Sequence, residues 1–184
     1  MKTILITGST DGIGKLAALK IAKEGHEVIL HGRSKQKLQC LIDEVKTLSG
    51  NERVRGLIAD FSNLEEVSKM AKTVCRDIPK LDVLINNAGV FKVENTQNKD
   101  GLDVRMVVNY LAPYVLTNAL LPLLDKSAKG RVVNLSSAAQ ESVEEAVLKG
   151  EEYIDAHSVY AQSKLALTMW SFDLAKEQQE VLVI

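Results

Sequence analysis

The sequence predicts an α/β fold in which a doubly wound parallel sheet lies between two layers of helices, and this three-layer α/β/α order ends at about a sixth strand. Short apolar runs alternate along the chain with longer segments of helical periodicity, which is typical of β-α-β units. The short runs are apolar at nearly every position, as expected of strands that helices cover on both faces. We therefore expect right-handed crossover connections and a single domain over residues 1–184.

The first strand, first helix and second strand lie within the first thirty residues. Residues 3–6 form an apolar run that predicts a strand. From Ile13 onward, apolar residues follow helical spacing until Gly25, which can end a helix. Residues 28–30 then predict the second strand.

The next two helices carry recognisable end signals. Ser34 can cap a helix that runs to about residue 48. Residues 54–58 predict the third strand, and an apolar stripe over residues 64–78 predicts a helix that Pro79 ends.

The second half of the chain continues this alternation. Pro113 lies inside the longest apolar helix pattern and should kink it. Residues 138–157 interrupt the rhythm and are rich in glutamate, which predicts a solvated loop or a short acidic helix. The other expected elements are a strand at 81–85, a helix at 102–124, a strand at 131–135, a helix at 158–178 and a strand-like run at 181–184.

The composition is that of a soluble globular domain. The 184 residues include 23 Lys and Arg and 24 Asp and Glu, so the formal net charge of −1 gives no reason to expect nucleic acid or an anionic membrane as a partner. Met1 and Lys2 lead directly into the first strand, and no uninterrupted run of about 18 apolar residues occurs. We therefore expect neither a signal peptide nor a membrane span.

The cysteines and histidines do not form a metal motif. Cys40 and Cys75 are far apart within helical patterns, which excludes a disulfide framework and favours a reducing, cytoplasmic location. His26, His31 and His157 have no partner residues at metal-ligand spacing, so we expect a helix-end or surface position for each and no bound metal.

A glycine-rich turn follows the first strand and opens the first helix, in the order Thr7-Gly8-Ser9-Thr10-Asp11-Gly12-Ile13-Gly14. Glycine permits the sharp turn, the close approach of backbone N–H groups to a pyrophosphate and the close packing of helix on strand, while the helix N-terminus favours negative charge. A merely tight turn is the alternative. The strand–turn–helix context favours dinucleotide binding by a Rossmann-type domain.

Further motifs occur at the predicted element boundaries. Asn86-Asn87-Ala88-Gly89 follows the fourth strand, Ser136-Ser137 follows the fifth, and Tyr160 and Lys164 have the spacing YxxxK. Together with the TGxxxGIG spacing of the glycine turn and with Asn109 in the long helix, they give the sequence its resemblance to the short-chain dehydrogenase/reductase family.

The resemblance extends from residue 3 to residue 184 and is most specific around the YxxxK motif. The stretch from Val159 to Ala166 and the long interval between Ser137 and Tyr160 resemble the retinol-dehydrogenase-like branch of the family.

Tyr160 and Lys164 also fit an acid–base role on chemical grounds. Residues four apart on a helix share one face, and an ammonium beside a phenol favours the phenolate, whereas a free tyrosine titrates near about 10. Ser137, at the carboxyl end of a strand, could hold the substrate oxygen. The resemblance implies that Asn109 holds a water that continues the proton path. The alternative, a solvated helix face, is disfavoured by the presence of Ser137 and the glycine turn.

The choice of nicotinamide cofactor depends on the residues after the second strand. An acidic residue there binds the ribose of NAD, whereas a basic residue accommodates the 2′-phosphate of NADP. Arg33 can bind a phosphate in a bidentate manner and Ser34 adds a hydroxyl, so we expect NADP(H) to be preferred over NAD(H), unless Arg33 is only a surface charge.

Asp60, after the third strand, resembles the family's adenine-contacting aspartate but could equally cap a turn. The expected cofactor-binding residues are Gly8, Ser9, Thr10, Asp11, Gly12, Ile13, Gly14, Arg33, Ser34, Asp60, Phe61, Asn87, Ala88, Gly89, Tyr160 and Lys164.

The resemblance implies further chain after the sixth strand, with a Pro-Gly turn at the nicotinamide and a substrate loop. Because the sequence stops at residue 184, we expect a truncated chain rather than a natural short form. In the acidic segment, Tyr153 and Ile154 are candidate substrate contacts.

The predicted function is NADP(H)-dependent hydride transfer between a nicotinamide and a small or lipophilic carbonyl or primary or secondary alcohol, with Tyr160 exchanging the proton. A non-catalytic dinucleotide-binding sensor or interaction module is the alternative, because a fold does not determine a function. The resemblance implies a homodimer or tetramer, and Met169, Trp170 and Phe172 are expected in the core or at a subunit contact.

Overall fold

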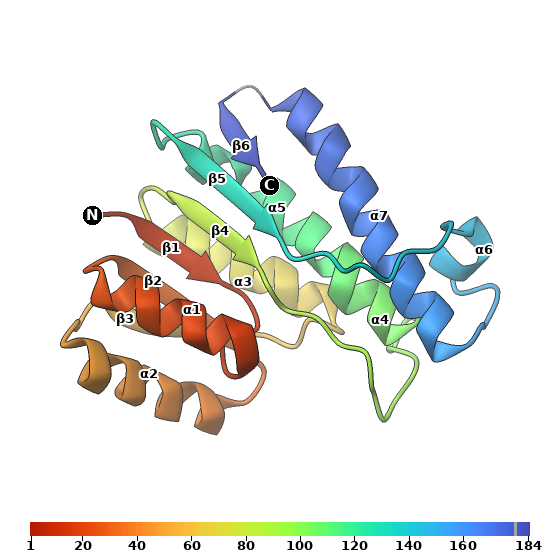
Figure 1. Cartoon of the computed structure of the whole chain (residues 1–184), viewed down its shortest axis with the longest axis horizontal. Helices are drawn as coiled ribbons and strands as arrows, with labels where there is room; N and C mark the ends of the chain where they lie inside the picture. The colour runs from red at the N-terminus through yellow and green to blue at the C-terminus, as the bar shows by residue number, and fades with distance from the viewer. Residues whose placement is uncertain (179) are drawn as a thin grey trace.

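The computed structural model describes residues 1–178 and 180–184 and confirms the predicted fold class. Six strands, each parallel to its neighbours, form one sheet in the order β3-β2-β1-β4-β5-β6 (Figure 1). The strands are β1 (Thr3–Ile6), β2 (Glu27–Gly32), β3 (Val54–Ile58), β4 (Val83–Asn86), β5 (Gly130–Asn134) and β6 (Val181–Val183).

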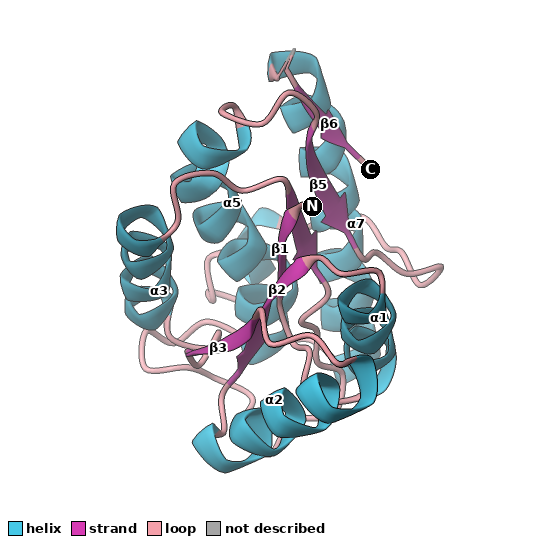
Figure 2. Ribbon diagram, turned by 90° about the vertical axis from the view of Figure 1, so that its left-hand side faces the viewer, coloured by secondary structure: helices cyan, strands magenta, loops and turns pink. Residues whose placement is uncertain are grey.

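Helices cover both faces of this sheet. Figure 2 shows α1 and α2 on one side of the strands and α3 and α5 on the other. The helices are α1 (Gly12–Lys23), α2 (Lys35–Ser49), α3 (Leu64–Asp77), α4 (Val104–Met106), the π-helical turn η1 (Val107–Leu111), α5 (Ala112–Leu124), α6 (Glu145–Leu148) and α7 (Ala156–Glu177).

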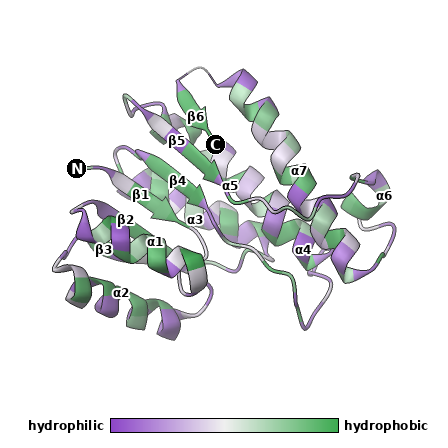
Figure 3. Ribbon diagram, in the orientation of Figure 1, coloured by the Kyte–Doolittle hydropathy of each residue, from purple (hydrophilic) through white to green (hydrophobic). Residues whose placement is uncertain are grey.

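Two hydrophobic clusters lie on opposite faces of the sheet. Neighbouring residues of β1 divide between them: Leu5 packs with residues of α3 and α5, whereas Ile4 and Ile6 pack with residues of α1 and α2. Figure 3 shows the hydrophobic residues that run along the strands. Successive side chains of a strand point to opposite faces, so a strand buried on both sides is apolar at every position.

The predicted helix ends are close to those observed. Ser34 caps α2, because its Oγ accepts a hydrogen bond from the backbone N–H of Lys37 at 3.4 Å. Gly25 has a left-handed φ of +78° two residues after α1 ends, and α3 ends two residues before Pro79.

The long helix differs from the expectation of a simple proline kink. A five-residue π-helical turn, η1, lies directly before the first turn of α5, which contains Pro113. The N–H of Ala112 donates to the carbonyl of Val107, five residues back. Because proline has no N–H to offer the carbonyl four residues earlier, the wider turn carries the chain past this position within the helix.

By length and composition this helical run could also cross a membrane, whereas no membrane span was expected from the sequence. It spans Val104–Leu124, and 56% of its most apolar 18-residue window is buried inside the fold. Core helices of soluble proteins have the same properties, and here α5 packs against α3 and the sheet.

The acidic segment after β5 contains one short helix, α6, as one of the two expectations had it. Ile154 packs against a small buried cluster of Met106, Val147 and Val159. The Tyr153 hydroxyl donates to the carbonyl of Gly101 at 3.2 Å. The two candidate substrate contacts of this segment are therefore engaged with the long helix and the loop before it.

Candidate active site

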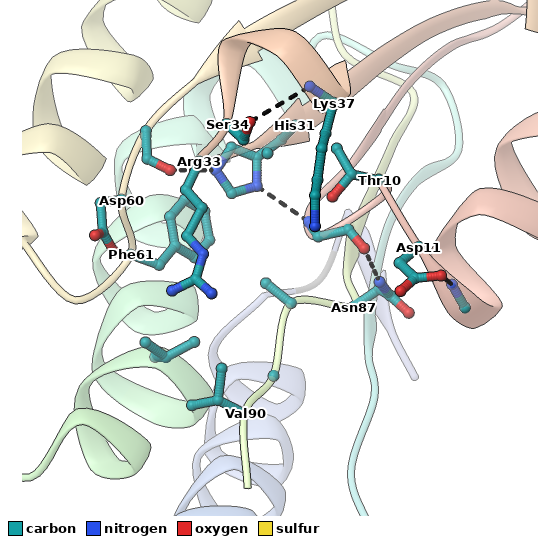
Figure 4. Close-up of a pocket in the computed structure, with 17 residues that line it drawn as sticks. Thr10, Asp11, His31, Arg33, Ser34, Lys37, Asp60, Phe61, Asn87 and Val90 are labelled. Atoms are coloured by element: carbon teal, nitrogen blue, oxygen red, sulfur yellow. Dashed lines mark hydrogen bonds between the residues drawn. The ribbon is translucent and has the colours of Figure 1, made fainter. Parts of the chain in front are cut away.

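The strand order reverses between β1 and β4, and the carboxyl ends of the strands on both sides open into one cavity. Open α/β sheets bind ligands at such a switch point. The cavity encloses about 560 Å³ and is shown in Figure 4. Its lining comes from the ends of β1 to β4 and from the long helix: Gly8, Thr10, Asp11, Gly12, His31, Gly32, Arg33, Ser34, Lys37, Ala59, Asp60, Phe61, Asn87, Ala88, Gly89, Val90 and Val108.

The glycine turn forms the edge of this cavity at the start of α1. Gly8 and Gly12 have φ values of +58° and +54°, which side chains rarely allow. A Cβ on Gly8 would lie 2.6 Å from the Cα of Ala88, and one on Gly14 would collide with the Asn87 side chain. Glycine is therefore needed at these positions both for the turn and for close approach to the β4 side of the site.

Thr7 joins the two sides of the switch point and was missed as a functional residue. Its Oγ1 accepts hydrogen bonds from the backbone N–H groups of Asn87 and Ala88, each at 3.0 Å. The Asn87 amide returns two hydrogen bonds, to the carbonyls of Thr7 and Gly8 at 2.9 and 2.8 Å. The first residue of the TGxxxGIG motif is the signal that could have identified it.

Cationic and hydroxyl groups gather where β2 leads into α2. Arg33 is exposed and Ser34 caps the helix, and both line the cavity. Lys37, in the first turn of α2, lines the same wall and extends beside the glycine turn in Figure 4. Sequence reasoning missed Lys37 because it stopped at the strand end and did not follow the first helical turn.

Asp60 takes the turn-capping role that the sequence left open and also lines the cavity. Its Oδ1 accepts from the backbone N–H and the hydroxyl of Ser62, at 2.9 and 2.8 Å. Phe61 is buried beside it, and its ring stacks on His31 with 4.1 Å between ring centroids.

The expected surface or helix-end position is wrong for His31, which is only 3% exposed and lines the cavity. The spacing of a single histidine does not reveal this position, whereas its place near the end of a strand that is buried after its first residue does.

Three of the predicted cofactor-binding residues in the glycine motif lie outside the cavity lining. Ser9 is buried behind the turn, where its Oγ accepts from the backbone N–H of His31 at 2.9 Å. Ile13 is exposed on α1, and Gly14 packs against Gly8 and Asn87.

Tyr160 and Lys164 share one face of α7, as their spacing predicts. The Lys164 Nζ lies 5.9 Å from the centroid of the Tyr160 ring and donates to the carbonyl of Leu135 at 2.7 Å. Burial lowers the pKa of the Lys164 ammonium, because the charged form loses its hydration. The Tyr160 and Phe91 rings pack in a T-shaped arrangement, with ring centroids 5.1 Å apart.

Asn109 lies in the middle of η1, and its side chain makes three hydrogen bonds. The Oδ1 accepts from the Val90 N–H at 2.8 Å, and the Nδ2 donates to the Val90 carbonyl and to the Ser163 Oγ, each at 3.0 Å. The side chain therefore fixes the loop after β4.

Ser137 lies at the start of the segment after β5, where its Oγ accepts from the N–H of Ala139 at 3.2 Å. Within the described residues no hydrogen bond joins Ser137 to Tyr160. Gly89 connects this region to the cavity, because a Cβ there would lie 3.4 Å from Asn109 Oδ1 and 3.5 Å from Lys164 Nζ.

These residues fit a dinucleotide. The glycine turn leaves open space at Gly12, beside the N-terminus of α1, for a phosphate, and Arg33 and Lys37 supply positive charge. Apolar walls from Phe61, Val90 and Val108 suit a flat ring.

Comparison with known proteins matches residues 2–184 to the family model for short chain dehydrogenases. The chain belongs to the short-chain dehydrogenase family. Within this family it belongs to the retinol-dehydrogenase-like branch: mouse retinol dehydrogenase 13 is 35% identical over 182 residues, which are 97% of this chain and 54% of that protein. Human polyprenol dehydrogenase is 34% identical over 182 residues, covering 95% and 55%.

Solved structures of short-chain dehydrogenases share the same architecture. A metagenomic short-chain oxidoreductase in complex with NADP aligns with a TM-score of 0.80 at 26% identity, over 99% of this chain and 78% of that one. A putative short chain dehydrogenase from Escherichia coli CFT073 complexed with NADPH aligns with a TM-score of 0.79 at 32% identity, over 98% and 73%. The chain spans about half the length of the retinol dehydrogenases it matches.

Proposed function

We propose that this short-chain dehydrogenase transfers a hydride between NADP(H) and the carbon of a carbonyl or of a primary or secondary alcohol. The observation that carries the proposal is Gly89, which lines the dinucleotide cavity on one side and meets Asn109 and Lys164 on the other. A bound nicotinamide would supply or accept the hydride. The chain's own residues would hold the cofactor and move the proton.

Tyr160 is proposed as the acid–base group that exchanges a proton with the substrate oxygen. Lys164, close to the same ring, would stabilise negative charge on the phenol oxygen. Ser137 would hold the substrate oxygen by its hydroxyl, and Asn109 would keep the loop at Val90 in place.

The preference for NADP(H) rests on the wall formed by Arg33, Ser34 and Lys37. The β2 strand ends at Gly32 without an acidic residue that would bind the ribose 2′-hydroxyl. Two cations and a hydroxyl beside a helix N-terminus suit a phosphate. Two of the similar structures, one in complex with NADP and one with NADPH, add support.

The exposed aromatic residues of α5 and α7 suit contact with a second copy of the chain, in line with the homodimer or tetramer that the family resemblance implies. The Tyr114 ring packs edge-on against Trp170 with 5.3 Å between ring centroids, and Tyr114 is exposed. Phe172, two residues after Trp170 on another face of α7, is also exposed. Aromatic residues are enriched at the centres of protein interfaces.

Free Cys40 and Cys75 accord with a reducing location such as the cytoplasm.

The decisive experiment compares wild type with Tyr160→Phe in two assays. Calorimetric titration measures the affinity for NADPH and NADH, and NADPH oxidation in the presence of aldehydes and ketones measures turnover. We expect NADPH to bind more tightly than NADH to both proteins, and turnover in wild type only. Tight binding without turnover in wild type would favour the non-catalytic dinucleotide-binding module, and turnover by Tyr160→Phe would refute the acid–base role.

A further inference from the structure

His31 is a buried histidine that the proposed proton transfer does not use. It is the second-to-last residue of β2 and lines the cavity, and its ring stacks on Phe61 with an interplanar angle of 26°. Its backbone is also held, because Ser9 bonds to its N–H and to its carbonyl through Oγ at 2.9 and 3.2 Å. The side chain therefore has one well-defined position.

The two ring nitrogens of His31 have partners that require different protonation. The backbone N–H of Gly8 donates to Nδ1 at 3.0 Å, so Nδ1 must carry a lone pair. Nε2 lies 3.0 Å from the carbonyl oxygen of Ala59, which can only accept, so Nε2 must carry the hydrogen. A doubly protonated ring would direct Nδ1–H against the N–H of Gly8.

We infer that His31 is a positioning residue that ties the glycine turn to the end of β3 and so presets the cofactor cavity in its binding shape. The inference rests on the proposed function, since the cavity is taken to hold a dinucleotide. Gly8 has a left-handed backbone and Phe61 forms the opposite wall, and the His31 ring contacts both. If the walls of the cavity are already ordered in the free protein, binding does not have to overcome the entropy cost of ordering them.

The surroundings of the ring favour its neutral form. Charged groups that line the same cavity are Asp11 from the glycine turn, Arg33 after β2, Lys37 on α2 and Asp60 after β3. Of these, Asp60 favours a charged His31, but burial dominates and lowers the pKa of His31 to about 4. Burial thus favours the neutral ring, and the hydrogen bonds at Nδ1 and Nε2 determine which of its two tautomers is present.

Two substitutions separate positioning from simple packing. His31→Leu keeps an apolar side chain but removes both hydrogen bonds, and we expect its Kd for NADPH to rise about tenfold, as for the loss of one or two hydrogen bonds. His31→Asn can present an amide oxygen near the place of Nδ1, and it should recover part of that loss. His157→Asn, on an exposed histidine at the start of α7, is the matched control and should leave the Kd unchanged.

Thermal unfolding of each variant is measured beside the Kd. A positioning role predicts that His31→Asn binds NADPH more tightly than His31→Leu even if both unfold at the same temperature. If both variants lose thermal stability while the Kd for NADPH stays at the wild-type value, the inference is overturned.

Nitrogen-15 NMR of the wild-type chain without cofactor gives an independent readout that does not need a variant to fold. We expect His31 to show a protonated Nε2 and an unprotonated Nδ1 throughout the range from about pH 5.5 to about pH 8, around the ordinary histidine pKa. A protonated Nδ1, or titration of His31 within that range, would overturn the inference. If wild type binds neither NADPH nor NADH, the proposed function fails, and the NMR result still decides whether His31 holds Gly8.

Discussion

Lys164, the proposed partner of Tyr160, carries a cost to stability. Its ammonium is buried, and the structure gives it the Leu135 carbonyl as hydrogen-bond acceptor and the Tyr160 ring as neighbour. Among the described residues no carboxylate pairs with this ammonium. A buried charge of this kind is unfavourable for folding, and burial accordingly lowers the pKa of Lys164.

Lys164→Met should therefore separate activity from stability. Methionine keeps much of the stem volume and removes the buried charge, so we expect the melting temperature to stay equal or rise, while turnover falls by about 10²-fold or more, as for loss of an acid–base partner. Steady-state kinetics and thermal unfolding of the same preparation test this. Turnover equal to wild type would show that the ammonium does not assist Tyr160.

His31 makes stability depend on pH in a defined direction. Its pKa is lowered by burial from the ordinary value of 6.5 to about 4 in the folded chain. Between these pH values the His31 ring is therefore protonated in the unfolded chain and neutral in the folded one. The stabilisation is complete above pH 6.5 and is lost as the pH falls toward 4, by up to about 3 kcal/mol.

Urea unfolding between these pH values should show this decline in wild type and a flatter profile in His31→Gln, which has no group that titrates there. Identical slopes in the two proteins would contradict the expected pKa of the buried ring.

At the scale of elements, a buried ion pair anchors the loop that joins β4 to the long helix. Arg105 donates to both carboxylate oxygens of Asp103 at 3.2 and 3.0 Å, and its Nε donates to the carbonyl of Phe91 at 2.8 Å. Phe91 in turn packs on Tyr160. Arg105, at the start of the long helix, thus holds Phe91, in the part of the loop close to β4, beside the proposed acid–base group Tyr160.

Arg105→Met should destabilise the protein by about 3–5 kcal/mol, because it leaves the Asp103 carboxylate buried without its partner. Lys99→Met is the matched control: it removes an ion pair of similar length, 2.7 Å to Glu65, from an exposed position and should leave the unfolding free energy unchanged within error. Chemical denaturation measures both. Equal effects of the two substitutions would show that burial does not distinguish these pairs.

For the molecule as a whole, the proposed pairing of copies through α5 and α7 makes Phe172 the most informative residue. Its side chain is 66% exposed, so Phe172→Glu should leave the fold intact. If this surface pairs two chains, the substitution should weaken their association by about tenfold or more, as expected for an aromatic residue at an interface centre. Light scattering after size-exclusion chromatography, over a range of concentrations, checks this. A wild-type monomer at every concentration would refute the pairing.

Much of the fold was predictable because its signals are local. The apolar strands and the capping by Ser34 depend on residues close in sequence, and the structure agrees with them. The π-helical turn was not predictable, because the proline rule indicates a disturbance near Pro113 without saying which form it takes.

The site was predicted less completely, since motifs identify residue types and not their partners. The convergence of Gly89, Asn109 and Lys164 brings together segments far apart along the chain. The burial of His31 and the place of Lys37 on the cavity wall likewise depend on strand order and helix orientation, which the spacing of one histidine or one lysine does not encode.

The hydrogen bonds between Asn109 and Val90 have a mechanical consequence. The Asn109 amide bonds to both the N–H and the carbonyl of Val90, as the backbone of a neighbouring strand would. A single side chain therefore holds the loop by two hydrogen bonds. Val90 lines the cavity, and the same amide bonds Ser163, the residue beside Lys164. Asn109 thus connects the loop, the long helix and α7 by hydrogen bonds. A ligand that displaces Val90 would therefore also displace α7, the helix that carries Tyr160.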